Sequence, residues 1–251
     1  MDKMIFTAFN TLNNIYDNRS VRAQNMANVN VPGYRRDIGT RPSGVAFMDN
    51  FNTLQSRALP IRDDLNYFEE TPGTLSATSS DLDVAVRGAG YFAVKGPGAP
   101  SLTRRGDLTI DADGFLVNGS KHQMLNQEGV PIEVPPYRSA RISDDGAVII
   151  EPVGSEPGTQ VVVDRLGIVG ASELPLKKFP DGEVRAEDGS LPPIDPSKSV
   201  VIRHMELSNV NITEELVNTI EDQRQYEINI KLLTSAKEAD EAGASLMRLP
   251  S

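Results

Sequence analysis

The chain has 251 residues, of which 39% are hydrophobic and 6% aromatic, with 20 glycines and 17 prolines. This length supports one substantial hydrophobic core or two modest ones, and the composition predicts many turns. The formal charge of -10 excludes a general nucleic-acid binder, because affinity for phosphate comes mainly from clustered Lys and Arg, and the lack of cysteine excludes disulfides and thiolate chemistry.

The first predicted element is an amphipathic helix over residues 3–28. Apolar residues recur there at alternating three- and four-residue spacing, which only Arg19 interrupts, so they share one side of a helix. This stripe consists of Ile5, Phe9, Leu12, Tyr16, Ala23 and Met26. A helix cannot bury such a narrow stripe by itself, and isolated helices are marginal in water. We therefore expect a packing partner.

A turn follows at Val31-Pro32-Gly33-Tyr34, because proline fixes one backbone dihedral and glycine tolerates positive φ. Residues 1–36 are thus predicted to form a helix and a turn. Residues 37–80 are polar and irregular, which is typical of a connector that is ordered by its neighbours.

Residues 81–199 are predicted to form a β domain. Leu82, Val84 and Val86 alternate with less apolar neighbours, and further short apolar runs are separated by turn formers. These runs cover residues 91–94, 108–110, 115–117, 123–125, 132–134, 147–150, 160–163, 167–171 and 182–185. Because no helical crossover lies between them, we expect the strands to pair mainly antiparallel.

Residues 200–251 are predicted to form a last strand, over 200–205, and a second amphipathic helix that continues to about Leu246. Asn211 or Thr213 is suited to cap the start of this helix. Its stripe contains Ile212, Leu216, Tyr226, Ile230 and Leu233, with Thr219 and Gln223 as polar members. The predicted fold is therefore mixed and mainly β, with a central antiparallel β domain flanked by terminal amphipathic helices.

No catalytic, cofactor-binding or metal-ligating residues are predicted. His122 and His204 lie in strand-like segments without an acidic or histidine partner at ligand spacing. The run 111–114 lacks the later ligands of a calcium loop and is better explained as a hairpin turn. An enzymatic or carbohydrate-binding β domain stays as a less favoured alternative. It would need a concave site with convergent polar side chains.

The two helical stripes have two explanations. They could pack on each other or on the β domain as ordinary core within one chain, or they could pack against other chains. Arg19, Thr219 and Gln223 favour assembly, because polar residues in a seam fix the register between neighbouring helices more than they stabilise a core.

Three segments resemble bacterial flagellar rod and hook proteins. The run QNMANVNVPGYRR, residues 24–36, resembles the signature that closes the first helix of that family. The run LDVAVRGAGYFAV, residues 82–94, is similar to the entry into its central β region. LSNVNITEELV at 207–217, followed by QRQYE at 223–227, is similar to the start of its C-terminal helix.

The resemblance implies a structural subunit of the flagellar basal-body rod, not an enzyme, that polymerises through its terminal helices and transmits torque from motor to hook. It is most similar to a proximal rod subunit; a distal rod or other hook or rod subunit is the alternative, and a chaperone-like partner of the flagellum is a third. The implied partners are other rod subunits and the flagellar type III export apparatus. No cofactor, nucleic acid, small-molecule substrate or membrane span is expected.

The same resemblance implies a place in the periplasmic rod and export without a cleaved signal peptide. Together with the stripes, it predicts a set of subunit-interface residues. These are Ile5, Phe9, Leu12, Tyr16, Asn25, Asn28, Asn30, Gly33, Tyr34, Asn209, Asn211, Leu216, Ile220, Tyr226, Ile230 and Leu233.

Overall fold

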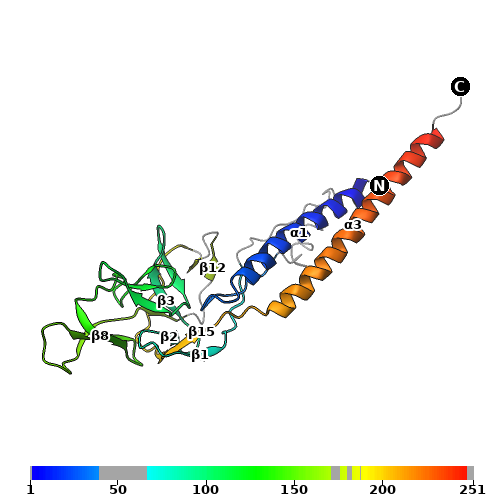
Figure 1. Ribbon diagram of the computed structural model, residues 1–251. Coiled ribbons are helices and arrows are strands. Elements are labelled where there is room, and N and C mark those ends of the chain that lie inside the picture. The colour runs from blue at the N-terminus through cyan, green and yellow to red at the C-terminus, as the bar shows by residue number, and fades with distance from the viewer. Residues whose placement is uncertain (1, 40–66, 171–175, 180–182, 187, 248–251) are drawn as a thin grey trace. The chain divides into compact units, whose positions relative to one another are not determined.

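The computed structural model describes residues 2–39, 67–170, 176–179, 183–186 and 188–247 (Figure 1). The chain divides into two compact units. The first, which we call the helix unit, contains Met1–Ala27, Asp37–Tyr67 and Asn211–Ser251. The second, which we call the β unit, contains Asn28–Arg36 and Phe68–Val210.

The helix unit is built on two helices, α1 (Asp2–Ala27) and α3 (Ile212–Met247), which lie side by side and antiparallel (Figure 1). Both helices were predicted at nearly these bounds. The start of α3 is capped by Asn211, whose Oδ1 accepts hydrogen bonds from the backbone N–H groups of Thr213 at 3.0 Å and Glu214 at 3.3 Å. Neither of these two described helices is long and apolar enough to cross a membrane.

The β unit is built from short strands that pair antiparallel, as the sequence predicts. The strands are β1 (Leu75–Ala77), β2 (Val84–Val86), β3 (Tyr91–Lys95), β4 (Pro100–Thr103), β5 (Leu108–Ile110), β6 (Leu116–Asn118), β7 (Gln123–Met124), β8 (Tyr137–Ile142), β9 (Ala147–Pro152), β10 (Val161–Arg165), β11 (Ile168–Val169), β12 (Leu176–Lys178), β13 (Val184–Ala186), β14 (Val200–Ile202) and β15 (His204–Glu206).

An eight-stranded sheet forms the centre of the β unit. Its strand order is β12-β13-β4-β3-β7-β6-β5, and β11 pairs with β3 beside this path. Three smaller sheets contain β10-β9-β8, β14-β2 and β1-β15. One buried apolar cluster contains Phe92, Leu116 and Val148, and a second contains Tyr91 and Leu102.

Side-chain acceptors close three successive hairpin turns in the same way. The Oδ1 atoms of Asp111, Asn118 and Asn126 each accept backbone N–H groups two and four residues later, at 2.8 to 3.0 Å. Asp and Asn favour turns because they hydrogen-bond the local backbone in this manner. The run that begins at Asp111 is therefore a hairpin turn, as predicted.

The structure differs from the predicted strands in six places. Strands β4, β8 and β12 were not predicted, and β1 lies inside the segment expected to be an irregular connector. Part of that connector, residues 40–66, lies outside the described residues. The predicted strand 132–134 forms only isolated bridges, and prolines at 131, 135 and 136 limit its hydrogen bonding. The predicted last strand is split into β14 and β15 by Arg203, which has a φ of 54°.

Candidate assembly interface

The contact between α1 and α3 includes buried ion pairs. Arg22 Nε donates to Asp222 Oδ2 at 2.6 Å, and its Nη1 lies 3.5 Å from Glu215 Oε2. Glu215 and Asp222 are buried. Because a buried charge is costly unless it is paired, these contacts fix how the two helices face each other.

Asn25, in the signature segment, lies at one end of this contact and is only 1% exposed. Its Oδ1 accepts the backbone N–H of Asp37 at 2.8 Å, and its Nδ2 donates to the Asp37 carbonyl at 3.0 Å and to Glu215 Oε1 at 3.1 Å. A single amide thus joins the end of α1 to the chain at residue 37 and to the first turn of α3.

The apolar residues that were predicted to lie at an interface are mostly exposed on the helix pair. Phe9 and Tyr16 of α1 are 57% and 76% exposed, whereas Ala8 and Ile15 are buried. On α3, the exposed fractions are 39% to 70% for Leu216, Ile220, Tyr226 and Ile230. Leu12 and Leu233 are half-buried, and the side chain of Ile5 lies outside the described residues.

These exposures argue against the first explanation of the stripes, in which each is buried as core within one chain. The polar pairs at Arg22 and Asn25 turn a different face of α1 toward α3, so that Phe9 and Tyr16 lie outside the contact. Sequence reasoning missed three further exposed residues on α3, Val217, Ile228 and Leu232, because they lie off the stripe.

The signature turn belongs to the β unit. Gly33 has a φ of +69°, and its N–H donates to the carbonyl of Glu206 at 2.7 Å. The ring of Tyr34 lies 4.0 Å from Lys178 Nζ, a cation–π contact. Asn28 accepts the N–H of Val31 through its carbonyl at 3.1 Å, and Asn30 is exposed.

We expect Gly33→Ala to destabilise the β unit by more than Gly88→Ala does. Both glycines have positive φ, but a Cβ at Gly33 would clash with the carbonyl carbon of Arg104, whereas nothing lies within 4 Å at Gly88. The left-handed backbone costs an alanine about 1–2 kcal/mol at either position, and the clash adds about 1–3 kcal/mol at Gly33 alone. Urea unfolding of the two variants measures the difference; equal losses would show that the turn tolerates a side chain.

A buried ion triad lies beside this turn. Glu206 Oε1 is 2.8 Å from Arg35 Nη2, Glu206 Oε2 is 3.0 Å from Arg104 Nη1, and Oε1 also accepts the N–H of Gly73 at 2.9 Å. All three charged side chains are at most 5% exposed. Burial lowers the pKa of the Arg104 guanidinium, and the charge of Glu206 opposes that shift. Burial also raises the pKa of Tyr91, against the nearby Arg35 and Arg104.

Asn209 makes internal contacts as well. Its Oδ1 accepts the N–H of Arg36 at 2.7 Å, and its Nδ2 donates to the carbonyls of Glu69 and Thr71, each at 3.0 Å. The structure therefore shows Gly33, Tyr34 and Asn209 in contacts within the β unit. Sequence reasoning missed the ion triad, since its members are separated by some 70 to 170 positions and no local pattern connects them.

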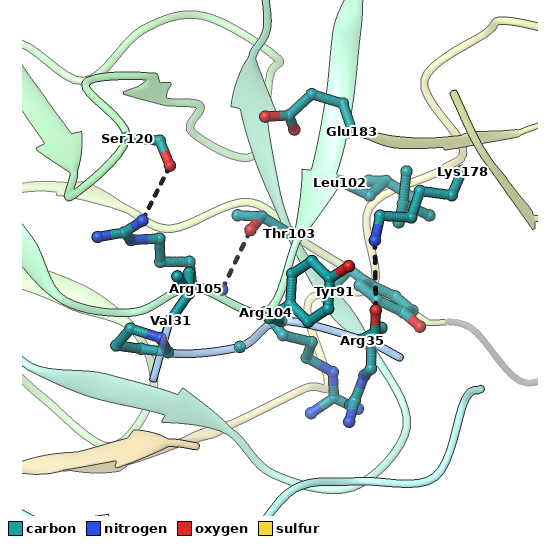
Figure 2. A pocket seen from close by; sticks show the side chains of 14 residues that line it. Val31, Arg35, Tyr91, Leu102, Thr103, Arg104, Arg105, Ser120, Lys178 and Glu183 are labelled. Carbon is teal, nitrogen blue, oxygen red and sulfur yellow. Dashed lines mark hydrogen bonds between the residues drawn. The ribbon is translucent and has the colours of Figure 1, made fainter. Parts of the chain in front are cut away.

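A pocket of about 100 Å³ opens between the signature turn and strands β4, β12 and β13 (Figure 2). Arg35, Arg105 and Lys178 are among the residues that line it; Lys178 Nζ donates to the Arg35 carbonyl at 3.3 Å, and Arg105 Nη1 donates to Ser120 Oγ at 3.1 Å. Pockets that bind metabolites are typically about 300–1,000 Å³. This hollow is too small for such a ligand.

The two histidines make structural contacts. His122 Nδ1 lies 2.8 Å from Glu183 Oε1, and His204 Nδ1 lies 2.8 Å from the carbonyl of Ile202. A catalytic alternative would be favoured by a pocket holding His122 with two carboxylates. The described contacts of His122 include one carboxylate, that of Glu183.

Two family models match parts of this chain. The family model "Flagellar basal body rod FlgEFG protein C-terminal" matches residues 203–246, and "Flagellar hook protein FlgE/F/G D1 domain" matches residues 85–150. The flagellar basal-body rod protein FlgF of Salmonella typhimurium is 30% identical over 99% of this chain and 100% of its own length. FlgF of Escherichia coli is 29% identical over 97% of this chain and 96% of its own length. FlgG of Buchnera aphidicola is 28% identical over 87% of this chain and 90% of its own length.

Proposed function

Because this chain belongs to the family of flagellar basal-body rod proteins and is a structural subunit of the rod, we propose that it forms part of the proximal rod and transmits torque through its terminal helices. Its partners in this proposal are copies of itself and neighbouring rod subunits. The family consists of structural proteins, so the chain is not an enzyme.

The observation that carries this proposal is the exposed apolar surface of α3. Ile212, Leu216 and Ile220 recur at four-residue spacing, and each is between 48% and 70% exposed. Burying such a side chain fully contributes about 1.5–3 kcal/mol relative to leaving it in water. Several such residues on one helix give association a strong driving force, while the polar contact with α1 leaves them available.

The proximal position is favoured over the distal one by the length of the chain and its modest β region. A distal rod subunit, or another member of the hook and rod family, is the second candidate. The relatives support both, since FlgF and FlgG proteins each match nearly the whole chain.

We place the subunit in the periplasmic part of the basal body, reached through the flagellar type III export apparatus without cleavage of a signal peptide.

Single-cysteine cross-linking in purified basal bodies tests the proposal. The chain has no cysteine, so Ile220→Cys gives one defined attachment point on the exposed surface of α3. We expect mass spectrometry to find the protein in the basal body and to join this position to another rod subunit. Ala112→Cys, in an exposed hairpin turn of the β unit, is the matched control and should give fewer such links. Absence of the protein from basal bodies would refute the assignment.

A further inference from the structure

The chain passes between the helix unit and the β unit four times, after residues 27, 36, 67 and 210. Three of these passages are hydrogen-bonded to one another inside the β unit. The N–H of Glu69 donates to the carbonyl of Arg36 at 2.8 Å, and the N–H of Asn209 donates to the carbonyl of Tyr34 at 3.3 Å. The residues involved lie within two or three positions of the places where the chain leaves the β unit.

The side chain of Asn209 completes this connection. It accepts the N–H of Arg36 on the second passage, and it donates to the carbonyls of Glu69 and Thr71 on the third, while Asn209 itself lies on the fourth. Only a side chain with both an acceptor and a donor can make these bonds. Aspartate lacks the donor, and alanine lacks both groups.

We propose that Asn209 is a positioning residue that braces the three passages, so that they leave the β unit at a fixed spacing. This inference rests on the proposed function, in which load on the helices must reach the β unit. Three connections that are not bonded to one another would each keep their own backbone freedom. Connections that are joined by hydrogen bonds can adopt fewer conformations. The brace therefore stiffens the three passages at the places where they leave the β unit.

Hydrogen exchange on the free full-length protein tests the brace directly. In Asn209→Ala we expect the amide of Arg36 to exchange about tenfold faster, because it loses its acceptor, while the amides of β3 stay unchanged. In Asn209→Asp the acceptor remains, so the amide of Arg36 stays protected. The amide of Glu69 should exchange faster, since a carboxylate oxygen then faces the carbonyls of residues 69 and 71.

Asn126→Ala is the matched control. Asn126 also makes three side-chain hydrogen bonds, to the N–H groups of Glu128 and Val130 and to Asp164 Oδ2, but it lies away from the passages. We expect this variant to leave the amide of Arg36 unchanged. Cells carrying Asn209→Ala should keep the protein in their basal bodies yet swim more slowly in viscous medium than cells carrying Asn126→Ala.

Three results would overturn the proposal. One is an unchanged amide of Arg36 in Asn209→Ala; another is faster exchange throughout β3, which would show that Asn209 only stabilises the fold. The third is equal swimming of the two alanine variants in viscous medium. Failure of the proposed function gives a different result, since the wild-type protein would then be missing from basal bodies while the exchange measurements still report on the brace.

Discussion

Glu206→Gln should lower the free energy of unfolding of the β unit by about 3–5 kcal/mol, the largest loss of stability that we expect from a single substitution in this chain. The amide keeps the size of the carboxylate but removes its charge, so Arg35 and Arg104 are left as two buried cations without their counter-ion. Since most domains are stable by only about 5–15 kcal/mol, the loss is a large share of the total. Urea unfolding followed by near-ultraviolet circular dichroism measures it.

Asp81→Asn provides the comparison for this experiment. Asp81 pairs with Arg203, but the two side chains are 49% and 61% exposed. A solvent-exposed ion pair contributes about 0–1 kcal/mol, so we expect little change in the urea midpoint. If the two variants lose similar stability, the triad does not anchor the signature turn.

Ile220→Asp should abolish swimming while leaving the free protein folded. Ile220 is 70% exposed, so replacing it costs the isolated chain no more than about 0.5 kcal/mol. In an assembled rod the same carboxylate would be buried against a neighbouring subunit, where an unpaired charge is strongly unfavourable. Motility in soft agar and recovery of the subunit in purified basal bodies are the two measurements.

Ile220→Val separates loss of apolar surface from gain of charge. Valine keeps a β-branched apolar side chain, and we expect cells with this variant to swim normally. Thermal unfolding of both purified variants should coincide with that of the wild type. Normal swimming of the aspartate variant would show that this face of α3 is not buried in the rod.

Local patterns in the sequence were sufficient for much of the fold. Alternating apolar residues predicted β2 and β3, and the run from Asp111 predicted a hairpin turn, because these features depend on residues close together in the chain. Strand β4 was missed, since it begins with Pro100 and is short. Its identity as a strand depends on pairing with β3 and β13, which no local pattern reveals.

Which faces of α1 and α3 contact each other could not be predicted from local patterns. Periodicity placed Phe9 and Tyr16 on a common stripe, but it does not say which partner that stripe meets. The polar groups of Arg22 and Asn25 decide how α1 faces α3, and their partners Glu215 and Asp222 lie about 200 positions away. Phe9 and Tyr16 consequently stay exposed on the helix pair.

The signature segment shows a second limit of sequence reasoning. Five of its residues, Asn25, Asn28, Asn30, Gly33 and Tyr34, were assigned to the subunit interface, and the structure shows Asn25 and Gly33 in contacts within the chain. Gly33 was identified correctly as a turn residue, because positive φ favours glycine. The reason that it must be glycine is the backbone of Arg104 beside it, which only the folded chain brings there.

The pairing of α1 with α3 has a consequence for the order in which this protein folds. Arg22 and Asp222 are 200 residues apart, so the first helix to be synthesised must wait for almost the last residues before it can dock. Contacts this distant in sequence form late, because the intervening chain loses freedom before they are made. The helix pair is therefore completed only once both α1 and α3 have been synthesised.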